Sequence, residues 1–336
     1  MRFPHVRFFL YSNDDIEFPS LQNVVQRTSS PKRRGVFWQH TQLLDMIHRD
    51  SPDVYWATNG LLPAWGLRNA VRVLTVHDFV HEFAPATQQR LNRWNRRVFQ
   101  SIAIRRATRV IAASDSTAAE MQQLCGRRAD FVIRPLAARH FSRPERSELE
   151  RVRGKLELPP SFWLVVGTLE PRKNIANLID AHLRCRSRGL NLPPLLVVGD
   201  DGWLNADIEK AIRQPEASGH IRRMGYVATG DLPALYSLCD LLLLPSIYEG
   251  FGMPILEAQM CGAPVVHGNH SSMIEAGGQL GVAVPPDLAS LERALAQLSI
   301  GELPLVCRLP SDPSIPSSSD AVAKLAMAFG LEPRRT

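Results

Sequence analysis

The sequence predicts an α/β protein with two Rossmann-like, doubly wound parallel-sheet domains that face each other across a cleft. Short β-rich apolar runs alternate with longer amphipathic stretches, which is the pattern of repeated β-α units. The runs at 195–198 and 241–244 contain no polar residue, as expected for parallel strands covered on both faces. At ~100–200 residues per domain, a length of 336 residues is enough for two domains, each with its own hydrophobic core.

The first domain is predicted over residues 1–145. We expect its strands at 6–11, 54–57, 71–76, 110–113 and 131–133. We expect helices at 39–49, 88–106 and 115–124.

The second domain is predicted over residues 146–298, after a charged connector that ends in Pro159-Pro160. We expect its strands at 162–166, 195–198, 241–244 and 264–267, and its helices at 175–187, 204–213, 231–239 and 253–261. Residues 299–336 are predicted to be an irregular Pro- and Ser-rich tail with one short helix at 320–328.

Composition narrows the class of protein. With 45% hydrophobic and 21% charged residues, the chain is too apolar to be disordered. No apolar run approaches the roughly 18–20 residues of a membrane span, and no signal peptide is recognisable at the start. The five cysteines lie far apart, which favours a reducing, cytoplasmic compartment over a disulfide framework.

The net charge of +6 is concentrated in the first half of the chain. Residues 1–150 hold 22 Lys+Arg against 14 Asp+Glu, and basic residues cluster at 90–109 as Arg90, Arg93, Arg96, Arg97, Arg105, Arg106 and Arg109. An anionic partner such as the inner membrane surface would suit this stretch, and a solvated arginine-rich surface accounts for it equally well.

The first candidate site is the turn at 167–174, which follows a buried strand and precedes a helix. Arg172 and Lys173 lie at that helix start, where exposed N–H groups and the positive end of the dipole attract anions. Their two charges oppose the dipole, and a phosphate would compensate them. The alternative is a solvated turn in which Asn174 is only the N-cap.

The second candidate site is the crossing at 249–257. Gly250 and Gly252 allow a ligand to approach the backbone, and Glu249 and Glu257 place two carboxylates at one strand-to-helix connection. Carboxylates are good acceptors for vicinal hydroxyls of sugars and ribose. The alternative is that both glutamates are surface charges.

The third candidate is His77, directly after the predicted strand at 71–76. This position points toward a cleft, and a histidine there is suited to transition-state contacts, with Asp78 to orient it. The alternative is a histidine satisfied by local hydrogen bonds. The Gly-x-Gly-x-x-Gly, Gly-Lys-Ser/Thr and His-Glu-x-x-His motifs are all missing, and so is any nucleic-acid-binding signature.

Taken in order, these motifs resemble the GT-B retaining glycosyltransferases of family four, also called glycosyl transferases group 1. The resemblance extends over residues 6–298. It rests on VGTLEPRKN at 166–174, GYV at 225–227, DLPALY at 231–236, PSIYEGFGMPILEA at 245–258, CGAPVV at 261–266 and SSMIE at 271–275.

The resemblance implies transfer of a sugar from a nucleotide diphosphate sugar to a glycan or lipid-linked acceptor, without a metal or other cofactor. Arg172 and Lys173 would hold the diphosphate, and Glu257 the ribose. Glu249, with the amides of Gly250, Phe251 and Gly252, would hold the donor sugar. His77 would lie beside the anomeric carbon. Gly167 and Val227 are further matched donor-binding positions.

The resemblance also has departures. It begins about one β-α unit late, so we expect an incomplete N-terminal domain, and the family's C-terminal helices are not recognisable after Ser299. A truncated sugar-nucleotide-binding pseudoenzyme is therefore an alternative to an active hexosyltransferase. A glycosidase would not need the Arg172–Lys173 site, and a nucleic-acid-binding module would rest on charge alone.

Overall fold

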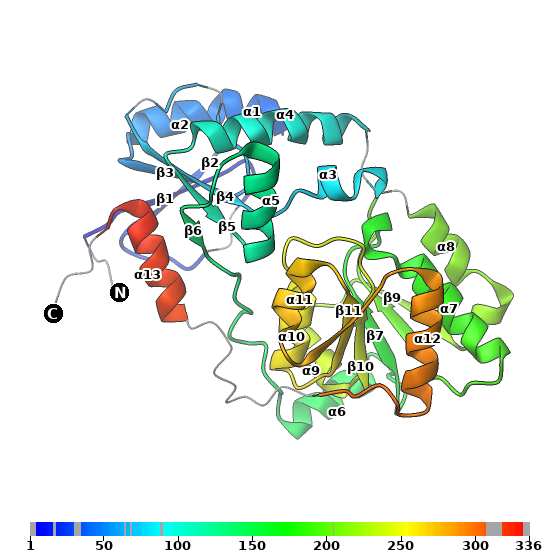
Figure 1. Ribbon diagram of the computed structural model, residues 1–336. Helices are drawn as coiled ribbons and strands as arrows, with labels where there is room; N and C mark the ends of the chain where they lie inside the picture. Colours follow the sequence, from blue (N-terminus) through cyan, green and yellow to red (C-terminus); the bar gives the residue numbers. More distant parts are fainter. Residues whose placement is uncertain are drawn as a thin grey trace.

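Parallel strands form the sheets of both lobes in the computed structural model, shown in Figure 1. The structure describes residues 5–15, 18–29, 35–63, 65–67, 69–87, 90–203, 205–306 and 318–331, without the side chains of 35–37, 90–95 and 318. Within the described residues, each helix is too short or too polar to serve as a membrane span.

The N-terminal lobe contains two parallel sheets. The strands β1 (Phe8–Ser12) and β2 (Val24–Thr28) pair with each other. The larger sheet has the order β3 (Val54–Ala57), β4 (Val71–Val76), β5 (Arg109–Ala112), β6 (Phe131–Val132). Its helices are α1 (Gly35–His40), α2 (Gln42–Asp50), α3 (Val80–Phe83), α4 (Arg90–Arg106) and α5 (Asp115–Cys125), with a 3-10 turn at η1 (Pro85–Thr87).

The C-terminal lobe has one six-stranded parallel sheet in the order β12-β11-β10-β7-β8-β9. Its strands are β7 (Trp163–Val166), β8 (Leu195–Val198), β9 (Ile221–Gly225), β10 (Leu241–Leu244), β11 (Val265–Gly268) and β12 (Gly281–Val284). From β7 the chain builds outward to β9, then returns to β10 and builds the other way. The order thus reverses between β7 and β10, where open α/β sheets bind their ligands.

Helices cover both faces of this sheet. They are α6 (Arg146–Lys155), α7 (Ile175–Ser187), α8 (Ala206–Ile212), α9 (Leu232–Leu238), α10 (Met253–Met260), α11 (Ser271–Gly277) and α12 (Leu288–Ser299), with 3-10 turns η2 (Pro171–Lys173) and η3 (Pro215–Ala217). The four residues of β7, of β8 and of β10 are all buried, which explains their uninterrupted apolar sequence.

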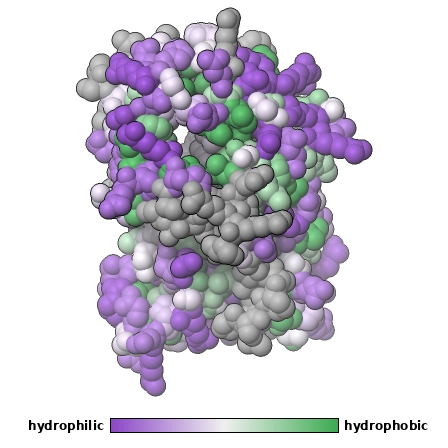
Figure 2. Space-filling model, turned by 90° about the vertical axis from the view of Figure 1, so that its left-hand side faces the viewer, coloured by the Kyte–Doolittle hydropathy of each residue, from purple (hydrophilic) through white to green (hydrophobic). Residues whose placement is uncertain are grey.

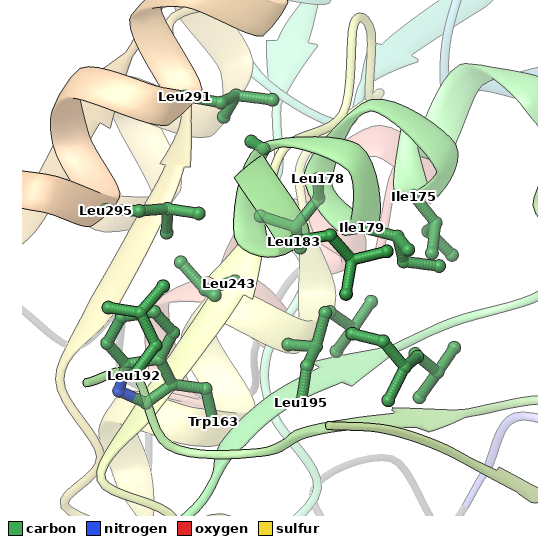
Figure 3. Packing of buried hydrophobic residues seen from close by; sticks show 14 of the residues in the cluster. Trp163, Ile175, Leu178, Ile179, Leu183, Leu192, Leu195, Leu243, Leu291 and Leu295 are labelled. Atoms are coloured by element: carbon green, nitrogen blue, oxygen red, sulfur yellow. The ribbon is translucent and has the colours of Figure 1, made fainter. Parts of the chain in front are cut away.

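The largest core lies on one face of the six-stranded sheet. In Figure 3, Leu291 and Leu295 of α12 lie across from Leu178 of α7, with Leu195 and Leu243 of the strands beside them. A second core on the opposite face contains Leu164 and Leu242. Because the same strands contribute to both cores, the ends of β7 and β10 are held firmly in place.

The helix α13 (Ser318–Phe329) lies against the N-terminal lobe, as Figure 1 shows. Ala328 is fully buried with Val73 and Ile111, and the rings of Phe329 and Trp56 lie 5.2 Å apart. The predicted tail thus contains its expected helix, and the chain returns to the first lobe, which the sequence had not indicated. Residues 307–317 of the predicted irregular segment lie outside the described residues.

On the side shown in Figure 2, hydrophilic residues line the rim of the molecule and hydrophobic residues lie between them in smaller patches.

The described cysteines Cys125, Cys185, Cys239 and Cys261 are free.

Candidate functional site

Two turns that follow neighbouring strands form the centre of the site. β7 pairs with β10, so the turn after β7, with Arg172 and Lys173, lies beside the turn after β10, with Glu249. Ile247 donates its backbone N–H to the carbonyl oxygen of Arg172 at 2.8 Å, which joins the two turns directly. The sequence separates these groups by 76 residues, and the sheet topology brings them together.

Glu249 forms ion pairs with Arg172 and Lys173, the two cations predicted to bind phosphate. Lys173 Nζ lies 2.6 Å from Glu249 Oε1, and Arg172 Nη1 lies 2.5 Å from Oε2. Ser246 Oγ donates a further hydrogen bond to Oε1 at 2.8 Å. Burial by itself would raise the pKa of Glu249, but the charges of Lys173 and Arg172 outweigh it and lower the pKa to about 2. The carboxylate is therefore ionised at neutral pH.

A second carboxylate lies behind this cluster. Glu170 is buried, and its Oε1 lies 2.5 Å from Arg172 Nη2, while its Oε2 has no hydrogen-bond partner. Burial raises the pKa of Glu170 despite the neighbouring cations. With both glutamates ionised, the charges of this cluster balance to zero.

The other predicted donor-side residues lie in the same lobe as this cluster. Glu257 lies within α10, where its Oε2 accepts a hydrogen bond from the hydroxyl of Tyr236 at 3.0 Å, and burial raises the pKa of Glu257. An added Cβ at Gly167 would lie 3.3 Å from Lys173 Nζ, so the lysine lies against this glycine. Val227 and Phe251 are buried in the same core of this lobe.

The loop of Gly250 meets the loop of His77 from the other lobe. An added Cβ at Gly250 would lie 2.3 Å from the carbonyl oxygen of His77, so only glycine permits this approach. Gly252 has φ of 98°, a left-handed conformation that also favours glycine, and it is the N-cap of α10. The structure thus brings together the three motifs that the sequence singled out.

His77 follows β4, as predicted, but a different group orients its ring. Its Nε2 donates to the carbonyl oxygen of Thr58 at 2.6 Å. The prediction that Asp78 orients His77 is wrong. The Asp78 carboxylate instead accepts from the backbone N–H of Val80 at 3.2 Å and lies 3.9 Å from Arg96.

A cavity of about 320 Å³ lies beside His77 in the N-terminal lobe. Its lining includes Asn59, Asp78, Arg96 and Gln100, whose side chains provide hydrogen-bond donors and acceptors. This mixture of polar groups is suited to hydroxyl-bearing ligands. Among the described residues, no three His, Cys, Asp or Glu side chains form a group that would hold a metal ion.

Asn174 is not the simple N-cap of the alternative reading. Its backbone is left-handed at φ 59°, and its side chain donates to the carbonyl oxygens of Pro286 at 2.6 Å and Pro245 at 3.2 Å instead of capping α7. It therefore fixes the basic turn against the ends of β10 and β12. Sequence reasoning missed this role and those of Ser246, Glu170 and Tyr236, because none of them belongs to the matched motif positions that were given a role.

Two lobes with parallel sheets and a polar site between them define a GT-B type of glycosyltransferase fold. The family model for glycosyl transferases group 1 matches residues 147–303, and that for glycosyltransferase family 4 matches residues 5–135. The chain belongs to the group 1 glycosyltransferases.

Individual relatives agree with this assignment. The O-antigen chain mannosyltransferase B of Escherichia coli is 35% identical over 192 residues, which are 56% of this chain and 50% of that protein. The chain thus spans about half the length of this relative.

Solved structures share the fold. A sucrose-phosphate synthase of Thermosynechococcus elongatus superposes with a TM-score of 0.76 over 97% of this chain and 88% of that chain, at 19% identity. The Anabaena protein HepE, in complex with UDP and glucose, superposes with a TM-score of 0.63 over 91% of this chain and 82% of that chain, at 21% identity.

Proposed function

We propose that this chain is a retaining hexosyltransferase that moves a sugar from a nucleotide diphosphate sugar to a glycan or lipid-linked acceptor in cell-surface polysaccharide synthesis. The observation that supports it most is the cluster of Arg172, Lys173 and Glu249 at the point where strand order reverses, opposite His77 of the other lobe. Because the relative is an O-antigen mannosyltransferase, mannose is the first donor sugar to test.

The donor would bind on the C-terminal lobe. Arg172 and Lys173 would turn from Glu249 toward the diphosphate and neutralise the charge that develops on the leaving group. Glu249 would then accept hydrogen bonds from the donor sugar, and Glu257 from the ribose. The amides of Gly250 to Gly252 would border the sugar, and the backbone near Gly167 and Val227 the nucleotide.

The transfer would occur on one face of the sugar. The bond from the anomeric carbon to the phosphate oxygen breaks, and the acceptor oxygen bonds to the same face, so configuration is retained. The acceptor's proton passes to the released phosphate. His77 would stabilise the sugar's developing positive charge through its ring Nδ1 or its carbonyl oxygen, with Nε2 held by Thr58. The charges of Arg172 and Lys173 would make a metal ion unnecessary.

A thermal-shift panel of UDP-, GDP- and ADP-sugars tests donor binding. We expect one nucleotide class to stabilise the wild type by roughly 2–3 kcal/mol at ~100 times the dissociation constant, with or without EDTA. Lys173→Ala and Glu257→Ala should each abolish the shift. Lys210→Ala, at an exposed lysine of α8, is the matched control and should retain it. A folded wild type that no donor stabilises would contradict the proposal.

We further propose that the chain acts in the cytoplasm and associates peripherally with the inner membrane surface through α4. Phe99 and Ile102 are exposed on this helix, and Arg97 and Arg105 are exposed beside them. An anionic surface attracts such a face by ~1 kcal/mol per nearby basic residue. Flotation with phosphatidylserine vesicles should show binding that high salt reverses. Binding that is absent at low salt would refute it.

A further inference from the structure

The hydroxyl of Tyr248 joins the catalytic loops of the two lobes. Tyr248 precedes Glu249 in the C-terminal lobe and is 1% exposed. Its oxygen accepts the backbone N–H of Phe79 at 2.7 Å, and Phe79 lies two residues after His77 in the N-terminal lobe. One side-chain oxygen therefore connects the loop of His77 to the loop of Glu249.

Glu120 of α5 holds this hydroxyl in place. Tyr248 donates its O–H to Glu120 Oε2 at 2.7 Å, so the hydroxyl both accepts and donates across the lobe boundary. The other carboxylate oxygen of Glu120 lies 3.3 Å from His270 Nε2. His270 Nδ1 lies 2.9 Å from Ser272 Oγ, which donates to the carbonyl oxygen of Glu249 at 2.5 Å. Glu120 is thus linked to Glu249 by two routes.

Ring packing leaves the phenol little freedom. The rings of Tyr248 and Phe83 stack with centroids 5.8 Å apart and an angle of 4° between planes, and the His270 ring lies 4.5 Å from Tyr248. Val80 and Ala84 complete this small apolar cluster. The phenol therefore enters the other lobe as a fixed group, and its hydroxyl finds both partners only when the lobes are together.

We propose that Tyr248, held by Glu120, is a positioning residue for sugar transfer: its hydroxyl sets the loop of His77 against the loop of Glu249 in the closed enzyme. This inference rests on the proposed function. A displaced loop would weaken contacts made in the transition state more than contacts made with the bound donor, so kcat should fall while the donor KM stays.

Two measurements on the full chain test the role. Hydrogen–deuterium exchange reports on the Phe79 amide without any turnover. Kinetics follow nucleoside diphosphate release from GDP-mannose, UDP-glucose and ADP-glucose with methyl α-mannoside as acceptor. Tyr248→Phe removes the hydroxyl and keeps the ring. Glu120→Ala removes the hydrogen-bond acceptor of that hydroxyl, and Glu120→Gln keeps an acceptor there. Trp203→Phe is the control, because it removes another interlobe hydrogen bond, from Trp203 Nε1 to Thr87 O at 2.8 Å.

We expect Tyr248→Phe to speed exchange of the Phe79 amide about tenfold, as loss of one hydrogen bond predicts. Its kcat should fall ~10–100-fold with the donor KM within about twofold, because small displacements of reacting groups are costly. Glu120→Ala should behave alike, while Glu120→Gln and Trp203→Phe should stay near the wild type.

Two results would contradict the proposed role of Tyr248. Unchanged Phe79 exchange in Tyr248→Phe would overturn the proposal, and so would a kcat no lower than that of Trp203→Phe. A wild type that releases nucleotide from none of the three donors would count against the proposed function instead. The exchange experiment would then still decide whether Tyr248 holds the two loops together.

Discussion

Glu249 is the residue on which the polar groups of the C-terminal lobe converge. It contacts Lys173, Arg172 and Ser246 through its carboxylate and Ser272 through its carbonyl oxygen. Burying a carboxylate between two cations costs desolvation of all three groups, which the hydrogen bonds and charges offset only while all partners remain. In the proposed function, a donor diphosphate that draws the cations away would therefore also release Glu249 for the sugar.

The ionisation of Glu249 makes stability depend on pH. Its pKa is about 2 in the folded chain, below the ordinary value of 4.5 expected when unfolded. The contribution is therefore complete above about pH 4.5 and lost as pH falls toward 2. The difference corresponds to about 3 kcal/mol. Glu249→Gln should destabilise the protein by about that amount at pH 7, since it removes the ion pair of Lys173 and leaves Arg172 with Glu170 alone.

Urea unfolding between pH 7 and pH 3 measures this effect. The wild type should lose more stability over that interval than Glu249→Gln, whose side chain does not titrate. Glu302→Gln, at an exposed glutamate after α12, should retain the wild-type slope. Parallel curves for the wild type and Glu249→Gln would show that the buried carboxylate is not the source of the acid sensitivity.

At the scale of elements, α13 ties the end of the chain to the first lobe. Lys324 Nζ donates to the carbonyl oxygen of Val132 at 3.1 Å, and Ala328 is buried against β4 and β5. The four-stranded sheet thereby gains a cover on the face that Val73 and Ile111 share. The chain crosses between the lobes once before α6 and again before α13.

Ala328→Asp should detach α13 from the sheet. Ala328 is fully buried against the apolar side chains of Val73 and Ile111, and burying a charge there is strongly disfavoured. Hydrogen–deuterium exchange of residues 318–329 should rise sharply while α7 stays protected. Val322→Asp places the same charge at a 37% exposed position of the same helix and should leave exchange unchanged. Equal exchange in both variants would mean that α13 is not held by this contact.

The sequence predicted most elements because the apolar pattern that indicates burial lies within each element itself. β8 and β10 are continuous apolar runs, and their predicted bounds match the structure. β9 was missed because Arg222 and Arg223 interrupt its apolar pattern at the edge of the sheet. α13 was predicted as a helix, but its docking depends on residues some 200 positions away and leaves no local signal.

The site was predictable to the extent that each loop follows a strand end. Arg172, Glu249 and His77 could be placed at the cleft in this way, and their roles in transfer remain predictions. The contact of Tyr248 with Glu120 was not predictable from the sequence. The two residues are 128 positions apart, and no sequence motif indicates that they touch. Asp78 was misassigned because its position next to His77 in the sequence does not decide which acceptor lies nearest to the histidine ring.

For the whole molecule, the described state has its two lobes in contact. Glu275 of α11 accepts the backbone N–H of Asp115 at 2.9 Å, so a carboxylate of one lobe lies at the positive N-terminus of a helix of the other. The hydroxyl of Ser114 lies 3.0 Å from the carbonyl oxygen of Gly250, and Ser116 Oγ lies 2.5 Å from Ser271 Oγ. These contacts are polar, and polar contacts would suit a cleft that opens for substrate and closes for chemistry.

Gly250→Ala should hold the cleft open. The new methyl group would lie 2.3 Å from the carbonyl oxygen of His77, so the lobes must separate to admit it, although each lobe can fold as before. Small-angle X-ray scattering should show a larger radius of gyration than in the wild type, and transfer should fall by about 10²-fold because the loops of His77 and Glu249 no longer approach each other closely. Gly230→Ala, where an added Cβ meets nothing within 4 Å, should change neither quantity. Normal activity in Gly250→Ala would mean that transfer does not require the close approach of these two loops.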